Sequence, residues 1–167
     1  MIIRKGQISD LSRIMEMYAS CVKGMIKNGI DQWDENYPNP KIITSDINSE
    51  TYYVAERNGD ILGGVNIDRN QDKTYLDINW EDQSPYFLVV HRLAAKEEFW
   101  GRKVGKNLMI FAEQLVVKKR LKSIRLDTYS GNPKAMEFYR SLEYKELGTI
   151  DLKPNKNKYH CFEKIII

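Results

Sequence analysis

The feature that most constrains the fold is an apolar run that leads through a glycine-containing loop into an amphipathic helix. Residues 86–95 are rich in β-branched and aromatic side chains, which favours a strand. Gly101 and Gly105 follow, and from Val104 to Val116 apolar side chains recur on one face of a predicted helix. A strand joined in this way to a helix is typical of a sheet with helices packed on its faces.

The rest of the chain extends this pattern. Periodicity and turn residues predict strands at residues 2–3, 51–56, 61–67, 124–128, 144–150 and 159–167. Helices are predicted over residues 8–25 and 41–48, and from Pro133 onward with Asn132 as the N-cap. Asn58-Gly59 is a hairpin signal, whereas residues 29–40 and 68–84 are predicted as irregular segments or loops. The order of elements predicts a mixed α/β fold whose sheet combines antiparallel and parallel strands.

Composition limits the class of protein. A length of 167 residues suits one domain, residues 1–167, and a hydrophobic fraction of 42% argues against disorder. A net charge of +3 is too small to indicate nucleic-acid binding, and residues 118–122 are basic where a helix should end. Two distant cysteines form neither a metal pair nor a disulfide framework. Without a signal peptide or membrane span in the sequence, we expect a cytoplasmic protein with no metal, membrane or nucleic-acid partner.

The loop before the third predicted helix has the chemistry of an anion site. The first turn of a helix carries amide groups without partners in the helix, at the positive end of its dipole. Arg102, Lys103 and Lys106 add charge that would suit a pyrophosphate. The spacing of Gly101 and Gly105 fits neither a Walker A loop nor a dinucleotide fingerprint. From these residues alone, an ordinary strand–helix turn remains an equally good interpretation.

The sequence resembles the GNAT N-acetyltransferases, most clearly in two segments. Residues 93–106 are similar to the family's acetyl-CoA signature, Q/R-x-x-G-x-G/A, which follows a strand. Residues 132–144 resemble its N-x-x-A-x-x-F-Y-x-x-x-G-F segment, and the likeness covers essentially the whole chain. Trp100 stands at the Gln or Arg of the signature and Lys103 at its first glycine, so Gly105 alone matches a fixed position.

The resemblance implies a central, mostly antiparallel sheet that splays at two parallel strands, with helices on both faces. It implies acetyl-CoA as cosubstrate and direct attack of an amine on the thioester. The implied cofactor-binding residues are Leu93, Ala95, Trp100, Gly101, Arg102, Lys103, Val104, Gly105, Lys106 and Asn132.

The resemblance also implies catalytic roles. Tyr139 aligns with the general acid that protonates the sulfur of coenzyme A, although its spacing from Ala135 and Leu142 equally suits a core aromatic. The residue that would remove the proton of the amine is less clearly indicated. His91 lies on the strand that carries it in some relatives, offset from the matching position at Val89, and histidine titrates near neutrality. A histidine packed in the sheet stays open as an alternative. The carboxylates of Glu56, Asp77 and Glu81, or a chain of water molecules, are alternative bases.

Aromatic residues in the segments where relatives vary are candidates for recognising the acceptor. Trp33, Tyr37 and Trp80 could receive an amine through cation–π contacts, although each residue taken singly is more typical of packing. We therefore expect a small-molecule or peptide amine as substrate, and a homodimer is compatible with the family. The main alternative function is a non-catalytic acyl-CoA-binding or regulatory module on the same fold.

Overall fold

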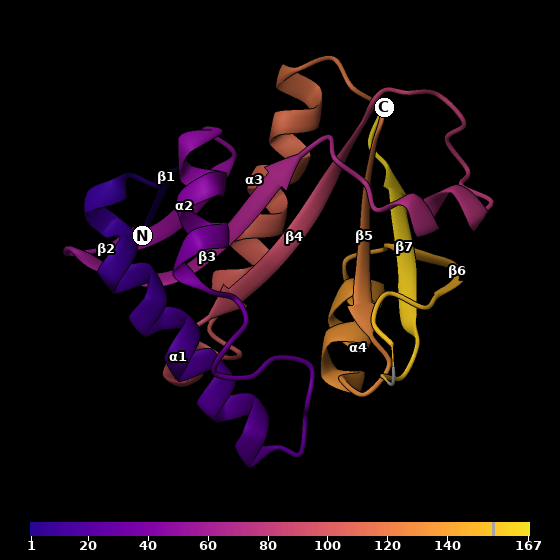
Figure 1. The fold of residues 1–167 in the computed structure, drawn as a ribbon. Coiled ribbons are helices and arrows are strands. Elements are labelled where there is room, and N and C mark those ends of the chain that lie inside the picture. The colour runs from indigo at the N-terminus through magenta and orange to yellow at the C-terminus, as the bar shows by residue number, and fades with distance from the viewer. Residues whose placement is uncertain (155) are drawn as a thin grey trace. The chain divides into compact units, whose positions relative to one another are not determined.

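The computed structural model describes residues 1–154 and 156–167, and the seven strands among them belong to one hydrogen-bonded sheet (Figure 1). The strands are β1 (Ile2–Lys5), β2 (Tyr52–Arg57), β3 (Asp60–Asp68), β4 (Phe87–Ala95), β5 (Ser123–Tyr129), β6 (Lys145–Ile150) and β7 (Tyr159–Ile165). The α-helices are α1 (Leu11–Lys27), α2 (Pro40–Asn48), α3 (Val104–Lys118) and α4 (Pro133–Ser141). Three short 3₁₀ helices are η1 (Ile8–Asp10), η2 (Lys73–Asp77) and η3 (Glu97–Phe99).

The strands follow the order β1-β2-β3-β4-β5-β7-β6 in the sheet. β4 and β5 run parallel, with Phe87 opposite Ser123 and Val89 opposite Arg125. The pairs β1–β2, β2–β3, β5–β7 and β6–β7 are antiparallel. The predicted mixed α/β class, with a mostly antiparallel sheet and one parallel pair, is therefore confirmed.

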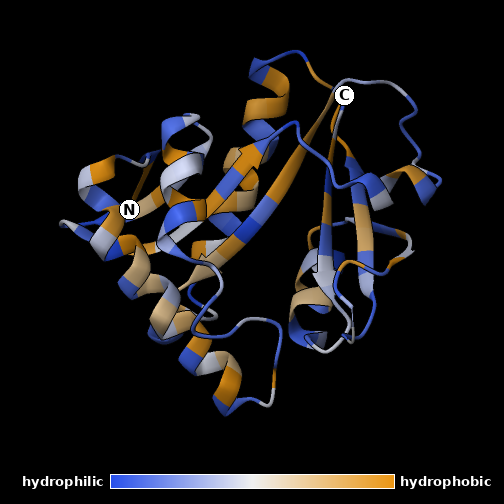
Figure 2. Ribbon diagram, viewed as in Figure 1, coloured by the Kyte–Doolittle hydropathy of each residue, from blue (hydrophilic) through white to orange (hydrophobic). Residues whose placement is uncertain are grey.

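Contacts divide the chain into two compact units, and β4 and α3 each contribute residues to both. The first unit comprises Met1–Ile67 and His91–Phe111. Its core lies between the apolar faces of α1 and α2 and the strands β2 and β3, and α1 shows apolar and hydrophilic colours in alternation (Figure 2). The hydroxyl of Tyr52 donates to that of Tyr18 over 3.0 Å inside this core, so two buried polar groups satisfy each other.

The second unit comprises Asp68–Val90 and Ala112–Ile167. Residues 68–84, which the sequence predicts as an irregular segment or loop, contain η2 and a segment anchored in the unit's core by Tyr75, Ile78 and Trp80. α4 begins as expected, because the side chain of Asn132 accepts a hydrogen bond from the amide of Ala135 over 3.2 Å. In the part of the chain that the structure describes, no helix is both long and apolar enough to cross a membrane.

Candidate functional site

The loop between β4 and α3 contains two residues in the left-handed region of backbone conformation. Gly101 has a φ of 75° and Lys103 a φ of 65°. Glycine adopts this conformation freely, whereas a residue with a side chain pays roughly 1–2 kcal/mol for it. The resemblance places a glycine at position 103, so the structure gives a physical reason for that glycine and shows that Lys103 adopts the same turn.

The charge of this loop suits an anion. Arg102, Lys103 and Lys106 are exposed, and Lys106 lies in the first turn of a helix of 15 residues. The amides of that first turn have no acceptor within the helix, and the helix dipole is positive there. The residues present therefore fit a diphosphate group, which backbone amides and mobile cationic side chains would hold together.

Trp100 has a structural role that the sequence did not indicate. Its indole N–H donates to the carbonyl oxygen of Ala95 over 3.0 Å, and its ring contacts the core of the first unit. A Cβ atom placed on Gly24 of α1 would lie 2.7 Å from Cη2 of this indole. The side chain of Trp100 thus packs the loop against α1, and its predicted contact with the cofactor stays a prediction.

This contact predicts the effect of a side chain at position 24. Gly24→Val should lower the free energy of unfolding by about 1–3 kcal/mol, because the indole must move from a well-packed site. A loss of stability would be informative, because replacing a glycine inside a helix otherwise tends to stabilise the helix. Urea denaturation measures the change, with Ala19→Val on the exposed side of α1 as the control. An unchanged or raised stability of Gly24→Val would contradict the packing.

The end of β4 directs alternate amides to opposite edges of the strand. The amide of Lys96 donates to the carbonyl oxygen of Leu62 in the neighbouring strand β3 over 2.9 Å. Since consecutive amides of a strand point in opposite directions, those of Leu93 and Ala95 point away from β3. The direction of the Leu93 amide suits the predicted pantetheine contact, whereas the backbone of Ala95 makes a hydrogen bond to the thiol of Cys21 in α1.

Arg92 is a residue of this region that sequence reasoning missed. Its φ of 53° interrupts the regular geometry of β4. Its guanidinium donates to Asp46 of α2 over 2.6 Å, and its carbonyl oxygen accepts from the hydroxyl of Tyr18 over 2.8 Å. Burial would lower the pKa of Arg92, but Asp46 and a hydrogen bond with Tyr37 outweigh burial and raise it. These contacts fix a local irregularity for which no sequence signal exists, because the partners lie far away in the chain.

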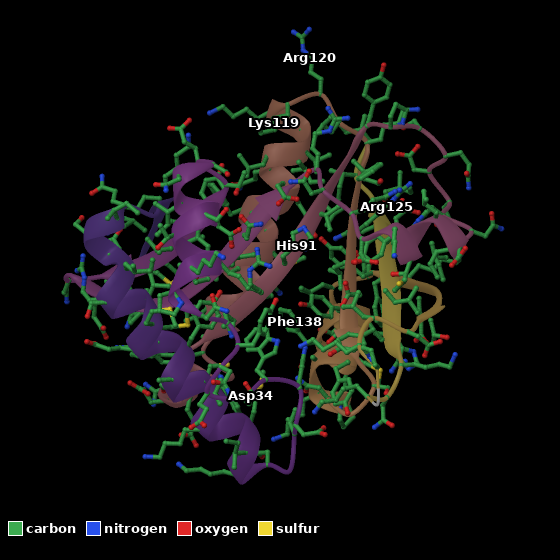
Figure 3. The ribbon with its side chains drawn as sticks, in the orientation of Figure 1. Asp34, His91, Lys119, Arg120, Arg125 and Phe138 are labelled. Atoms are coloured by element: carbon green, nitrogen blue, oxygen red, sulfur yellow. The ribbon has the colours of Figure 1, made fainter. Side chains whose placement is uncertain are left out.

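Two of the predicted acceptor residues lie together in the first unit. Trp33 packs edge-on against Tyr37, with ring centroids 6.3 Å apart, and against Tyr18 at 5.8 Å. Both Trp33 and Tyr37 are partly exposed. His91, labelled in Figure 3, is also partly exposed and directly precedes Arg92 in β4. The roles of these three residues stay predictions.

Trp80 lies in a different environment from the one expected of a substrate-binding residue. It is 6% exposed, and its indole N–H donates to the carbonyl oxygen of Tyr75 over 2.8 Å. Its ring packs against the guanidinium of Arg125, 4.5 Å from the ring centroid. This side chain packs in the core of the second unit, and its role in binding the acceptor stays a prediction.

The environment of Tyr139 bears on both interpretations of this residue, as a core aromatic and as a general acid. Its ring packs against Phe138, Tyr144 and Phe162, so it is a core aromatic of the second unit. It is 7% exposed, and burial, followed by the negative charge of Asp127, raises the pKa of its hydroxyl. A tyrosine in this environment keeps its proton at neutral pH, which a general acid needs.

Comparisons with solved structures show that the fold is shared with known acetyltransferases. A GNAT-family acetyltransferase from Streptococcus agalactiae 2603 matches with a TM-score of 0.83 and 24% identity, over 98% of this chain and 94% of the other. The PaiA N-acetyltransferase of Thermoplasma acidophilum, solved in complex with coenzyme A, matches with a TM-score of 0.73 and 20% identity over 98% of both chains. At these identities the similarity establishes the fold.

The sequence comparisons define the family. The model of the acetyltransferase (GNAT) family matches residues 13–144, and the chain therefore belongs to this family. It is 24% identical to YesJ, an uncharacterized N-acetyltransferase of Bacillus subtilis (strain 168), over 94% of this chain and 86% of YesJ. Family membership makes the protein an acetyltransferase of the acyl-CoA-using kind. Among the described residues, no group of three or more His, Cys, Asp or Glu side chains could hold a metal ion.

Proposed function

We propose that this protein transfers the acetyl group of acetyl-CoA to a primary amine by direct attack, with Tyr139 as the general acid. The observation that carries the proposal is the cationic loop at the start of α3, where Gly101 and Lys103 adopt left-handed conformations next to the helix N-terminus. A loop of this kind suits the diphosphate of coenzyme A. The outward amide of Leu93 would bind the pantetheine arm and polarise the acetyl carbonyl.

In the proposed reaction, the amine nitrogen forms a bond to the carbonyl carbon and the carbon–sulfur bond breaks. Tyr139 gives its proton to the departing sulfur, which leaves as the thiol of coenzyme A. The amine must lose its own proton, to His91 or to a chain of water molecules. Trp33 and Tyr37 are the proposed aromatic contacts of the acceptor.

A binding measurement and a turnover measurement together test this function. At a concentration about 100 times its dissociation constant, coenzyme A should stabilise the protein by about 2.7 kcal/mol and raise Tm by roughly 5–10 °C. A panel of primary amines with acetyl-CoA should then release free thiol. A thermal shift without thiol release would favour the non-catalytic acyl-CoA-binding module, and no shift with either coenzyme A or acetyl-CoA would refute both functions.

A further inference from the structure

A chain of buried hydrogen bonds in the first unit ends on the backbone of β4. The hydroxyl of Tyr52 in β2 donates to that of Tyr18 in α1 over 3.0 Å, and Tyr18 donates to the carbonyl oxygen of Arg92 over 2.8 Å. Tyr52 is 0% exposed and Tyr18 is 1% exposed. Burial is the main cause that raises the pKa of both hydroxyls, so each keeps the proton that it donates. A Cβ atom at Gly64 would overlap the hydroxyl of Tyr52, so glycine at this position of β3 makes room for the chain.

The backbone conformation of Arg92 is unusual and is held from two sides. Its φ of 53° lies in the left-handed region, which residues with a side chain rarely occupy. Its guanidinium donates twice to Oδ2 of Asp46 in α2, from Nε over 3.1 Å and from Nη2 over 2.6 Å. Asp46 therefore holds Arg92 by its side chain, and Tyr18 holds it by its carbonyl oxygen. All three residues belong to the first unit, so this arrangement lies within one compact body.

The bond from Tyr18 acts on the amide of Leu93 through the peptide group. The carbonyl of Arg92 and the N–H of Leu93 belong to the same peptide unit, which is planar and trans and holds the two groups in opposite directions. A donor that fixes the carbonyl oxygen therefore fixes the direction of the N–H as well. Hydrogen bonds in such a chain also polarise one another, which strengthens Leu93 as a donor. The two tyrosines thus influence both the direction and the strength of one backbone donor.

The amide of Leu93 is the backbone donor that the proposed reaction uses. The amide of Lys96 donates to Leu62 of β3, and alternation along the strand directs the amide of Leu93 away from β3. Among the described residues, the parallel register of β4 with β5 extends from Phe87 to Val89 of β4. Leu93 lies beyond this register, so the amide points to the side of β4 where a bound thioester could replace a neighbouring strand.

We propose that Tyr18 is a positioning residue of the reaction, which aims the amide of Leu93 at the carbonyl oxygen of the acetyl thioester through the peptide group of Arg92. This inference rests on the proposed N-acetyltransferase function and adds the residues that prepare its backbone donor. Negative charge develops on the carbonyl oxygen as the amine attacks, and a donor held in place before the reaction stabilises it most. Tyr18 itself touches neither the acetyl group nor the amine.

Tyr18→Phe tests this role, because it removes the bond to Arg92 and keeps the ring. With the best amine of the panel, kcat should fall at least about tenfold, whereas KM for the amine and the affinity for coenzyme A should stay within about twofold. Tyr52→Phe removes a hydroxyl from the same core but keeps the bond from Tyr18, so kcat should fall less than about threefold. Tyr53→Phe removes a hydroxyl from a ring that packs against Phe111 and should leave kcat unchanged. An equal fall in Tyr18→Phe and Tyr52→Phe, or no fall in Tyr18→Phe, would overturn the proposal.

The carbonyl stretching band of bound acetyl-CoA reports on the donor directly. A hydrogen bond to the carbonyl oxygen lowers the frequency of this band, and an isotope label on the acetyl carbonyl separates the band from those of the protein. In difference infrared spectra, the band should lie at a higher frequency in Tyr18→Phe than in the wild-type protein, and Tyr53→Phe should match the wild type. Equal frequencies in Tyr18→Phe and the wild type would contradict the positioning role.

The infrared measurement needs no amine, so it separates this inference from the proposed function. If the difference in frequency is present but no amine releases thiol, the transfer function fails and the positioning of the donor by Tyr18 stands. If neither coenzyme A nor acetyl-CoA binds, both fail. Should Tyr18→Phe not fold, the double variant Tyr18→Phe with Tyr52→Phe takes its place, because it leaves no hydroxyl at this site without an acceptor, and the same rise in frequency is expected.

Discussion

Replacing Glu163 by alanine should lower the free energy of unfolding by about 3–5 kcal/mol, because it leaves a buried arginine without its charge partner. Glu163 is 1% exposed and accepts hydrogen bonds from Arg125 over 3.2 Å, from the hydroxyl of Ser123 over 3.0 Å and from the amide of Glu81 over 2.7 Å. The hydroxyl of Ser123 keeps Asp82 as a second acceptor over 3.2 Å, so the main loss falls on Arg125, which is 4% exposed. Urea denaturation at neutral pH measures the change.

The arrangement around Arg125 explains why this loss should be large. The guanidinium lies between two aromatic rings, 4.0 Å from the centroid of Phe87 and 4.5 Å from that of Trp80. It cannot turn toward water without leaving both rings. The pair thereby connects β5 and β7 to the segment that contains Glu81 and Asp82. These contacts help to hold that segment in a defined conformation.

Two further variants serve as controls for this prediction. The double replacement Arg125→Met with Glu163→Leu should cost less than the sum of the two single changes, because it removes both charges together. Lys145→Ala, which breaks an exposed ion pair with Glu81, should change stability by less than about 1 kcal/mol. A loss below about 1 kcal/mol for Glu163→Ala would show that the buried pair contributes little.

The sequence predicted the elements whose signals are local. Asn132 and Pro133 mark the start of α4, and the structure confirms the cap and the helix. Asn58-Gly59 correctly marks the turn between β2 and β3, where both residues have positive φ. The apolar run before Gly101 is β4 and the amphipathic stretch after it is α3. In each case a few neighbouring residues determine the local conformation, so no distant partner is needed to infer it.

The features that the sequence did not predict depend on distant partners. Trp80 belongs to a polar segment, and its burial follows from Arg125, which lies 45 positions later in the sequence. The left-handed conformation of Arg92 depends on Asp46 and Tyr18, each far away in the sequence. Asp127 carries no motif that distinguishes it from a surface carboxylate, and its bond to Tyr75 becomes visible only in the folded unit. Long-range contacts of this kind override local propensity.

Replacing Tyr139 by phenylalanine should lower kcat by about 10²–10⁴-fold, the range that general acid catalysis contributes. The phenyl ring keeps the contacts with Phe138, Tyr144 and Phe162, so the fold should remain intact. What is lost is a hydroxyl whose raised pKa keeps it protonated. Steady-state thiol release with the best amine of the panel measures kcat, and calorimetric titration measures the affinity for coenzyme A, which should change by less than about twofold.

Tyr144→Phe is the matched control for this prediction. Tyr144 belongs to the same aromatic cluster, 6.1 Å from Tyr139 between ring centroids, and it is also buried, but its hydroxyl bonds to Glu113. Losing that hydroxyl should affect stability by about 1 kcal/mol and leave kcat within about twofold. If Tyr139→Phe retained the wild-type kcat, the hydroxyl would have no role in protonating the sulfur, and Tyr139 would be a core aromatic alone. If both variants slowed turnover equally, the effect would come from a disturbance of the aromatic cluster and not from proton transfer. The two changes share only the loss of a buried hydroxyl.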